Sequence, residues 1–242
     1  MKKTKSILHQ SVIVFIIGIM SSFTHSIFAG EVGITADLMD ITVKHNGKDF
    51  KIERDQDITA EVDPTFAKTS RPCPPFCIFP MKIAEGVETV GELEVIDYLK
   101  RMNAGENILV IDSRTQDWVS LGVIPGAINL PWTKLNPKKG ATTEDIMTIM
   151  QTHFNVTLKE DVDDIAVDEA IVSGDTTTVF NFSKAKTLVM YCNGMWCGQS
   201  PNNIKNLLKF GYPAEKIKWY RGGMQNWSNL GLSVVKKDPM ED

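Results

Sequence analysis

Apolar residues fall into short blocks along the chain, and the spacing within each block predicts a secondary-structure element. Runs of apolar and β-branched residues predict buried strands of a parallel sheet at residues 108–111 and 187–191, and a further strand is expected at residues 216–220. A stripe with helical spacing predicts a helix over residues 89–102, carried by Val90, Leu93, Ile96 and Leu99. Because strands alternate with helices, we expect an α/β domain with a central parallel sheet flanked by helices.

The remaining elements follow from turn residues and caps. Asn46-Gly47 predicts a tight turn between two short strands, so we expect a hairpin in a small N-terminal extension. Ser200 and Pro201 predict the cap and first turn of a helix that stops at Gly211. Further expected elements are the hairpin strands at 40–44 and 49–53, a helical turn at 116–118, a turn and short strand at 123–131, a helix at 144–154, and a closing helix at 224–230 that buries Trp227.

The first 29 residues read as a targeting segment rather than as part of the fold. Three lysines precede the apolar run SVIVFIIGIM, and small residues lead to a plausible cut after Ala29. We therefore expect a cleaved signal peptide and a periplasmic or secreted protein without a stable membrane anchor. The alternative is an uncleaved anchor, although the apolar run is short for a membrane span.

Removal of this segment makes the protein more acidic. It leaves 23 basic residues against 30 acidic ones, a net charge of −7 in place of −4. An acidic protein of this kind is a poor candidate for nucleic-acid binding. Export implies an oxidising compartment, so the four cysteines have to be considered as disulfides, and their spacing favours the local pairs Cys73–Cys77 and Cys192–Cys197.

Two segments carry competing interpretations. Cys73-Pro74-Pro75-Phe76-Cys77 is either a structural disulfide in an irregular Cys-Pro-rich arm or, with Met81, a redox or copper-handling pair. The acidic residues between positions 160 and 169 suggest either a calcium site or a solvated surface. The spacing of an EF-hand loop is missing, so we expect the solvated surface and no metal site.

Cys192 has the strongest chemical context in the sequence. It ends the predicted strand 187–191, and a loop with two glycines then leads into a helix. Main-chain N–H groups and the positive end of a helix dipole stabilise an anion at such a position. Since the thiolate is the nucleophilic form of cysteine, Cys192 is the candidate nucleophile.

Four segments together resemble the rhodanese family over about residues 89–235. They are LVIDSR at 109–114, GVIPGAINLP at 122–131, LVMYC at 188–192 and YRGGMQNW at 220–227, and residues 136–186 form an insertion between them. The expected domain order is therefore a signal peptide at 1–29, an N-terminal extension at 30–85 and, as the resemblance implies, a rhodanese-like domain at 86–242. The loop also resembles an exported subgroup with a CNGxWC-type loop.

The resemblance implies sulfur transfer without a cofactor. Cys192 would accept sulfane sulfur from a small donor such as thiosulfate, a polysulfide or a persulfide, and would pass it to a thiol acceptor. Asp112 and Arg114 would hold the scaffold of the loop. The donor would be cradled by the remaining loop residues, namely Asn193, Gly194, Met195, Trp196, Gly198 and Gln199.

One departure from the family pattern changes the expected chemistry. Cys197 occupies the position of the family's usual loop arginine, and the loop contains no Lys or Arg. Affinity for anionic donors is therefore in question, and phosphatase chemistry lacks its phosphate-binding cation. Cys197 is able to attack a Cys192 persulfide and leave a disulfide, while an inert Cys192–Cys197 disulfide is the alternative.

Two other classes of function compete with sulfur transfer. A non-catalytic rhodanese-fold module would bind a periplasmic redox partner through its arm or its insertion. A protein that handles copper or another soft metal would use Cys73 and Cys77.

Overall fold

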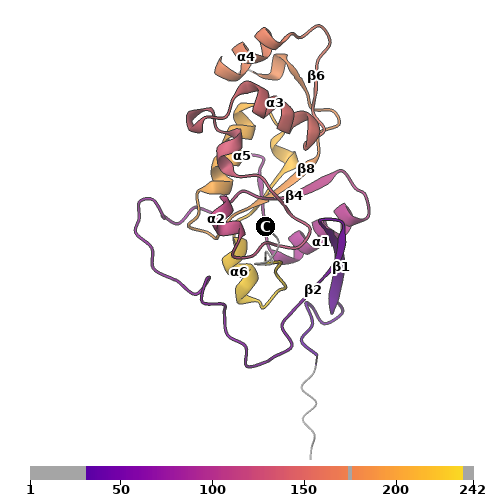
Figure 1. Ribbon diagram of the computed structural model, residues 1–242, viewed down its shortest axis with the longest axis vertical. Coiled ribbons are helices and arrows are strands. Elements are labelled where there is room, and N and C mark those ends of the chain that lie inside the picture. The colour runs from indigo at the N-terminus through magenta and orange to yellow at the C-terminus, as the bar shows by residue number, and fades with distance from the viewer. Residues whose placement is uncertain (1–30, 174–175, 237–242) are drawn as a thin grey trace, which may run out of the picture. The chain divides into compact units, whose positions relative to one another are not determined.

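Five parallel strands form the central sheet of the computed structural model, which describes residues 31–173 and 176–236 (Figure 1). The spatial order of the strands is β3-β9-β8-β4-β5, so β8 lies at the centre. This confirms the predicted α/β class. The strand bounds are β3 (Glu88–Val90), β4 (Ile108–Asp112), β5 (Ile128–Asn129), β8 (Thr187–Tyr191) and β9 (Ile217–Tyr220).

The central strands are buried on both faces, as their continuous apolar sequences predict. Successive side chains of β8 alternate between two clusters: Leu188 and Met190 belong to one, and Val189 and Tyr191 to the other. This is the two-residue period of a strand. The sheet therefore separates two hydrophobic cores, and Cys192 follows the strand that both cores enclose.

Helices cover both cores. Val95, Ile96 and Leu99 of α1 (Glu92–Asn103) and Trp227 of α6 (Gly223–Asn229) enter one core. Ile204 and other residues of α5 (Gln199–Lys209) enter the opposite core, and α2 (Gln116–Val119) follows β4. The expected burial of Trp227 is confirmed, since none of its side chain is exposed.

The predicted helix at 89–102 was wrong at its start. Residues 88–90 instead form β3, which pairs in parallel with β9, and Gly91 caps α1. Leu93, assigned to the apolar stripe, is 52% exposed, whereas Val95 is buried in its place. The buried face of α1 differs from the predicted one because Val90 belongs to the edge strand β3 and not to the helix. The residues of α1 that are buried are Val95, Ile96 and Leu99.

The N-terminal hairpin forms as predicted, from β1 (Asp40–His45) and β2 (Lys48–Glu53). Asn46 and Gly47 both take positive φ angles in the turn, which asparagine and glycine tolerate best. Ile41, Val43 and Ile52 are buried in the same core as α1 and α6. The hairpin is therefore part of the core that supports β8.

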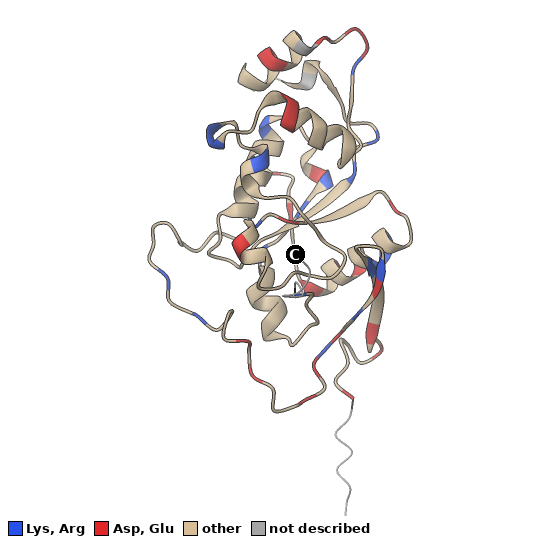
Figure 2. Ribbon diagram, viewed as in Figure 1, with Lys and Arg blue, Asp and Glu red and all other residues tan. Residues whose placement is uncertain are grey.

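An arm without regular secondary structure joins β2 to β3 (Figure 1). Phe66 of the arm enters the core, and Glu53 at its start pairs with Ser233 near the other end of the chain. Most of the acidic residues of the arm gather in its first part, between residues 55 and 63, and basic residues follow at 68, 71 and 82 (Figure 2). Cys73 and Cys77 form a disulfide within it.

The segment 136–186 has more structure than its sequence pattern predicts. The expected helix appears as α3 (Thr143–Thr152), while α4 (Asp164–Ser173) and the two-stranded sheet of β6 (Thr157–Leu158) and β7 (Phe180–Asn181) were missed. Phe154, Val167 and Phe180 join the core that contains α5. The short strands escaped prediction because two residues are too few to show a period. Four 3₁₀ helices complete the described elements, η1 (Trp132–Leu135), η2 (Pro137–Lys139), η3 (Thr176–Thr178) and η4 (Ala214–Lys216).

The acidic stretch of this segment is solvated. Glu160, Asp161, Asp163, Asp168 and Glu169 are exposed. Within residues 31–173 and 176–236, no group of three or more His, Cys, Asp or Glu side chains is arranged to hold a metal ion. The predicted signal peptide and its cut after Ala29 lie outside the described residues. In the part of the chain that is described, no helix has the length and apolar character needed to span a membrane.

Replacing Ile52 by alanine tests whether the hairpin belongs to the core. Ile52 is fully buried, so we expect Ile52→Ala to lower the free energy of unfolding by about 2–5 kcal/mol. Ile58→Ala is the matched control because Ile58 is 74% exposed, and its effect should stay within about 0.5 kcal/mol. Urea titration measures both. A separate hairpin transition at lower urea would contradict a shared core.

Candidate active site

The loop from Cys192 to Gly198 joins the central strand β8 to α5 and rests directly on the start of α6. Met224 N–H donates to the Cys192 carbonyl at 3.0 Å, and Gln225 N–H donates to the Asn193 carbonyl at 2.9 Å. Gly223 takes φ +55°, and a Cβ placed there would lie 2.3 Å from the Cys192 carbonyl oxygen. Only glycine therefore permits this approach, and the approach sets the position of the nucleophile.

The Cys192 sulfur is enclosed by hydrogen-bonding groups. The side chain is 2% exposed, and the Ser200 hydroxyl lies 3.1 Å from its Sγ atom. Main-chain N–H groups of Gly194 and Ser200 also point to this sulfur. When protonated, the thiol donates to the Cys197 carbonyl at 3.2 Å. These donors provide part of the cradle that the loop was expected to form.

Cys197 lies beside Cys192, and both are free thiols in this structure. Burial raises the pKa of Cys192, but hydrogen bonds from Cys197, Ser200 and Gly194 outweigh it and hold the pKa below its ordinary value. Burial and the adjacent Cys192 sulfur raise the pKa of Cys197 well above its ordinary value. Cys192 therefore ionises before Cys197, and the Cys197 thiol is then a donor to the Cys192 thiolate.

Ser200 has a different place from the one predicted. The helix α5 begins at Gln199 with Gly198 at the cap position, so Ser200 is not the cap. Its hydroxyl accepts a hydrogen bond from Trp219 Nε1 at 3.1 Å and lies against Cys192 Sγ. Because the indole N–H occupies a lone pair of the hydroxyl oxygen, the hydroxyl proton is free to point at the sulfur.

Asp112 and Arg114 form a buried ion pair that braces the loop. Arg114 Nη2 lies 2.6 Å from Asp112 Oδ2, and both side chains are almost fully buried. The same guanidinium donates to the Trp118 and Gly122 carbonyls and, at 3.3 Å, to Asn193 Oδ1. With these acceptors in place, the pair holds the loop and leaves Arg114 no donor directed at a ligand.

The other expected loop residues face the arm. Met195 accepts a main-chain hydrogen bond from Phe79 N–H at 2.8 Å, and Gly198 faces the Phe79 ring. The Trp196 indole donates to Gln225 Oε1 at 2.8 Å, and Gln199 Oε1 lies 3.9 Å from Cys197 Sγ. The loop is therefore held between α6 and the arm.

Cys73 and Cys77 form a disulfide with each other in this structure. Bonded to each other, the two sulfurs offer no thiolate pair for copper. Phe76, inside the disulfide ring, packs edge-on against Trp196 with ring centroids 5.6 Å apart. The cross-linked turn thus places an aromatic side chain over the active loop.

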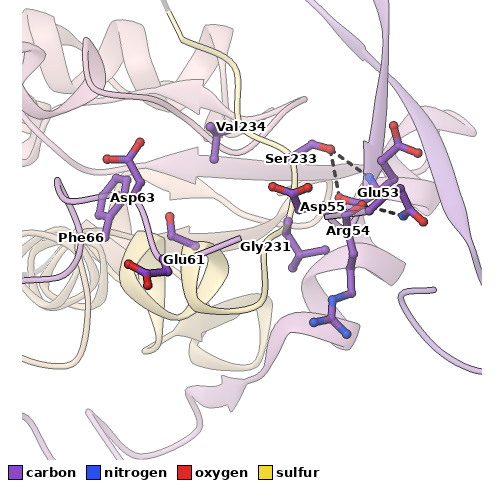
Figure 3. A pocket seen from close by; sticks show the side chains of 12 residues that line it. Glu53, Arg54, Asp55, Glu61, Asp63, Phe66, Gly231, Ser233 and Val234 are labelled. Carbon is purple, nitrogen blue, oxygen red and sulfur yellow. Dashed lines mark hydrogen bonds between the residues drawn. The ribbon is translucent and has the colours of Figure 1, made fainter. Parts of the chain in front are cut away.

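A pocket of about 340 Å³ opens beside the loop. It reaches Cys197, whereas Cys192 does not line it. Its aromatic walls are formed by Phe76, Trp118, Trp132 and Trp196. A second cavity of about 400 Å³, drawn in Figure 3, lies between the arm and the segment 228–234. It is lined by carboxylates such as Asp55, Glu61 and Asp63 and contains no cysteine, so it is not the candidate site.

Several residues at the site were not identified as such from the sequence. Trp219 and Gln225 support Ser200 and Trp196 through hydrogen bonds, and Arg71 and Phe76 contact the loop from the arm. The closing segment YRGGMQNW signalled the importance of Gln225 only as part of a family pattern. No pattern in the sequence linked Arg71 to the loop, because the contact joins segments far apart in the chain.

Replacing Gly223 by alanine tests the contact between α6 and the loop. We expect Gly223→Ala to lower the free energy of unfolding by at least about 3 kcal/mol, because the added methyl group meets main-chain atoms. Gly140→Ala is the control, since Gly140 has φ +93° but no atom within 4 Å of the place that a Cβ would take, and should lose about 1–2 kcal/mol. A denaturant titration measures the free energy of unfolding of both variants. Equal losses in Gly223→Ala and Gly140→Ala would refute the close approach of the loop to Gly223.

The lowered pKa of Cys192 predicts an early thiolate in a pH titration. With the disulfide intact, only two thiols titrate, and ultraviolet thiolate absorbance should show its first midpoint below pH 9. Ser200→Ala removes a donor to the ionised form, so this midpoint should move to higher pH. Ser120→Ala, which removes an exposed hydroxyl, should leave it unchanged. An unshifted midpoint in Ser200→Ala would show that Ser200 does not stabilise the thiolate.

Comparison with known proteins places this geometry in a family. Residues 95–230 match the family described as the rhodanese-like domain. Similar solved structures include the BH2092 protein from Bacillus halodurans, with 17% identity, coverage of 62% of this chain and 77% of that one, and a TM-score of 0.39. No curated protein matches the chain.

Two further solved structures have comparable similarity. RPA3614 from Rhodopseudomonas palustris CGA009, described as a possible tyrosine phosphatase, is 18% identical, with 63% of this chain and 88% of that chain covered and a TM-score of 0.38. The human single-domain sulfurtransferase TSTD1 is 16% identical, with 58% and 95% covered and a TM-score of 0.31. The domain match spans more than half of the chain and includes β4, β8 and the Cys192 loop, and the chain therefore belongs to the rhodanese-like domain family.

Proposed function

We propose that this protein is an exported sulfurtransferase in which Cys192 carries sulfane sulfur as a persulfide. One observation carries the proposal: the Cys192 sulfur lies at the end of the central strand with hydrogen-bond donors directed at it and a lowered pKa. Such surroundings stabilise a thiolate and, after transfer, a persulfide anion. Membership in the rhodanese-like domain family supports a role of the sulfur-transfer type.

The chemistry has two balanced steps. The Cys192 thiolate attacks the sulfane sulfur of the donor, a Cys192–sulfur bond forms, the donor's bond to that sulfur breaks, and the leaving group departs with the electron pair. An acceptor thiolate then attacks the terminal sulfur of the persulfide, which becomes the acceptor's persulfide as the Cys192 thiolate is restored. Neither step changes the number of electrons on the protein, so no cofactor takes part.

Cys197 gives the site a second outcome. The Cys197 sulfur attacks the inner sulfur of the Cys192 persulfide anion, the persulfide's sulfur–sulfur bond breaks, and the Cys197 proton moves to the terminal sulfur, which leaves as hydrosulfide; a Cys192–Cys197 disulfide remains. An external dithiol then has to reduce this disulfide before the next turnover. We assign Cys197 this resolving role because it lies beside Cys192 and lines the pocket beside the loop.

Adjacent buried thiols also favour a second candidate, a redox module that exchanges electrons with a periplasmic partner through a Cys192–Cys197 disulfide. This function would need no sulfur donor. The two candidates differ in the mass of the Cys197→Ser variant after exposure to a donor. A persulfide carrier gains one sulfur in this variant, whereas a redox module gains none.

Intact mass of protein recovered from the periplasm, with peptide mapping, tests the proposal. Before treatment, the mass should match a mature chain that begins after Ala29. After thiosulfate or polysulfide treatment of the reduced loop, the Cys192 peptide should gain one sulfur, and Cys192→Ser should gain none. Cys197→Ser should keep the sulfur longer, because the resolving thiol is absent. Full loading of Cys192→Ser would reject the persulfide carrier, and so would the absence of any sulfur gain in Cys197→Ser, where no thiol is left to resolve the persulfide.

A further inference from the structure

One cation at the active site lacks an acceptor for its donors. The Arg71 guanidinium lies over the Trp196 ring, 3.8 Å from its centroid, and within 6 Å of the Trp118 and Phe76 ring centroids. Among the described residues, none forms a hydrogen bond or ion pair with this guanidinium, and its Nε is buried without an acceptor. Since buried N–H donors are rarely left unpaired, the arrangement indicates a ligand that accepts from Arg71.

The other arginines near the loop are already engaged. Arg114 is paired with Asp112 and donates to main-chain carbonyls, and Arg221 donates to the Phe79 carbonyl through both Nε and Nη2. The loop from Cys192 to Gly198 contains no Lys or Arg. Among the arginines of the described site, Arg71 is therefore the one left to meet an anionic ligand.

The position of Arg71 connects it to the reacting sulfurs. With Phe76 and Trp196 it lines a cavity of about 740 Å³, and these two aromatic residues also line the smaller pocket that reaches Cys197. Burial lowers the pKa of Arg71, and the nearby Cys197 sulfur raises it in turn. The guanidinium stays charged in any case and acts within electrostatic reach of the thiol pair.

We propose that Arg71 is the anion-recognition residue of the donor site and binds the sulfur-oxyanion head of thiosulfate or of an organic thiosulfonate. A guanidinium offers a planar fork of donors that matches two oxygens of such a head, and stacking on Trp196 fixes its plane. The disulfide-closed arm thus provides the cation that the loop itself lacks.

This inference rests on the proposed function and specifies its donor. The Cys192 thiolate attacks the outer sulfur of thiosulfate, the sulfur–sulfur bond breaks, and sulfite leaves with the electron pair. With a thiosulfonate, the leaving group is a sulfinate. In both reactions the leaving group is an oxyanion, so Arg71 stabilises the charge that develops on it.

Ligand binding without transfer tests Arg71 independently of catalysis. In the full mature chain with the arm disulfide intact and Cys192→Ser present, calorimetry measures the binding of benzenesulfonate and of its neutral analogue benzenesulfonamide. Arg71→Gln should weaken benzenesulfonate binding about tenfold or more and leave the neutral analogue unchanged. Arg71→Lys should fall between, because it keeps the charge and loses the fork. Lys68→Gln removes an exposed charge from the same arm and should change neither.

Each other result overturns the inference. Equal affinity of Arg71 and Arg71→Gln proteins for benzenesulfonate would exclude an anion site, as would no binding to either. Equal weakening of both probes would show that Arg71 only packs the arm. A second measurement uses proteins with Cys192 intact. If Arg71→Gln needs the same thiosulfate concentration as wild type to load sulfur onto Cys192, the inference is rejected while the sulfurtransferase proposal stands. If neither protein loads sulfur, the sulfurtransferase proposal fails and the calorimetry still decides the role of Arg71.

Discussion

A buried sulfur that has to ionise is the constraint around which this site is built. Burial alone opposes a thiolate, so the anion depends on donors that are fixed before any ligand arrives. At Cys192 these donors are the Ser200 hydroxyl, main-chain N–H groups and the Cys197 thiol. Each is held by another contact, such as the hydrogen bond from Trp219 to Ser200. The surrounding fold is largely the means of keeping these donors in place.

The closing segment 220–227 links that constraint to the rest of the molecule. Gly223 admits the loop backbone, Gln225 accepts from Trp196, and Arg221 anchors the arm at Phe79. Trp227, only a few residues later, is fully buried in the core shared with the N-terminal hairpin. Loop, arm and core therefore meet in one short stretch, and a change in any of them reaches Cys192 through it.

The arm extends the site beyond what the loop alone provides. Its disulfide closes a turn that brings Phe76 onto Trp196, and Arg71 stacks on the same Trp196 ring. The loop has Cys197 at the position where the family usually has an arginine, and the cation that lies against this loop is Arg71 of the arm. Under the two proposals made above, the second thiol of the loop resolves sulfur and the cation of the arm recognises anions.

The sequence by itself determined the features that depend on neighbouring residues. Apolar runs and helical stripes predicted the parallel sheet, Asn46-Gly47 predicted the hairpin turn, and Cys192 at a strand end identified the candidate nucleophile. Local patterns carry this information because strand and helix periods are set within a few residues.

Only the tertiary structure decided which distant groups meet. Ser200, predicted to cap a helix, instead contacts the Cys192 sulfur. Residues 88–90, predicted to be helical, form an edge strand because they pair with β9. Arg71 lies over Trp196, a contact that no sequence pattern predicted. None of these contacts leaves a periodic or compositional trace, because each joins single residues across long stretches of chain. The physical reason is that packing and charge act through space, whereas a sequence pattern records only what lies close along the backbone.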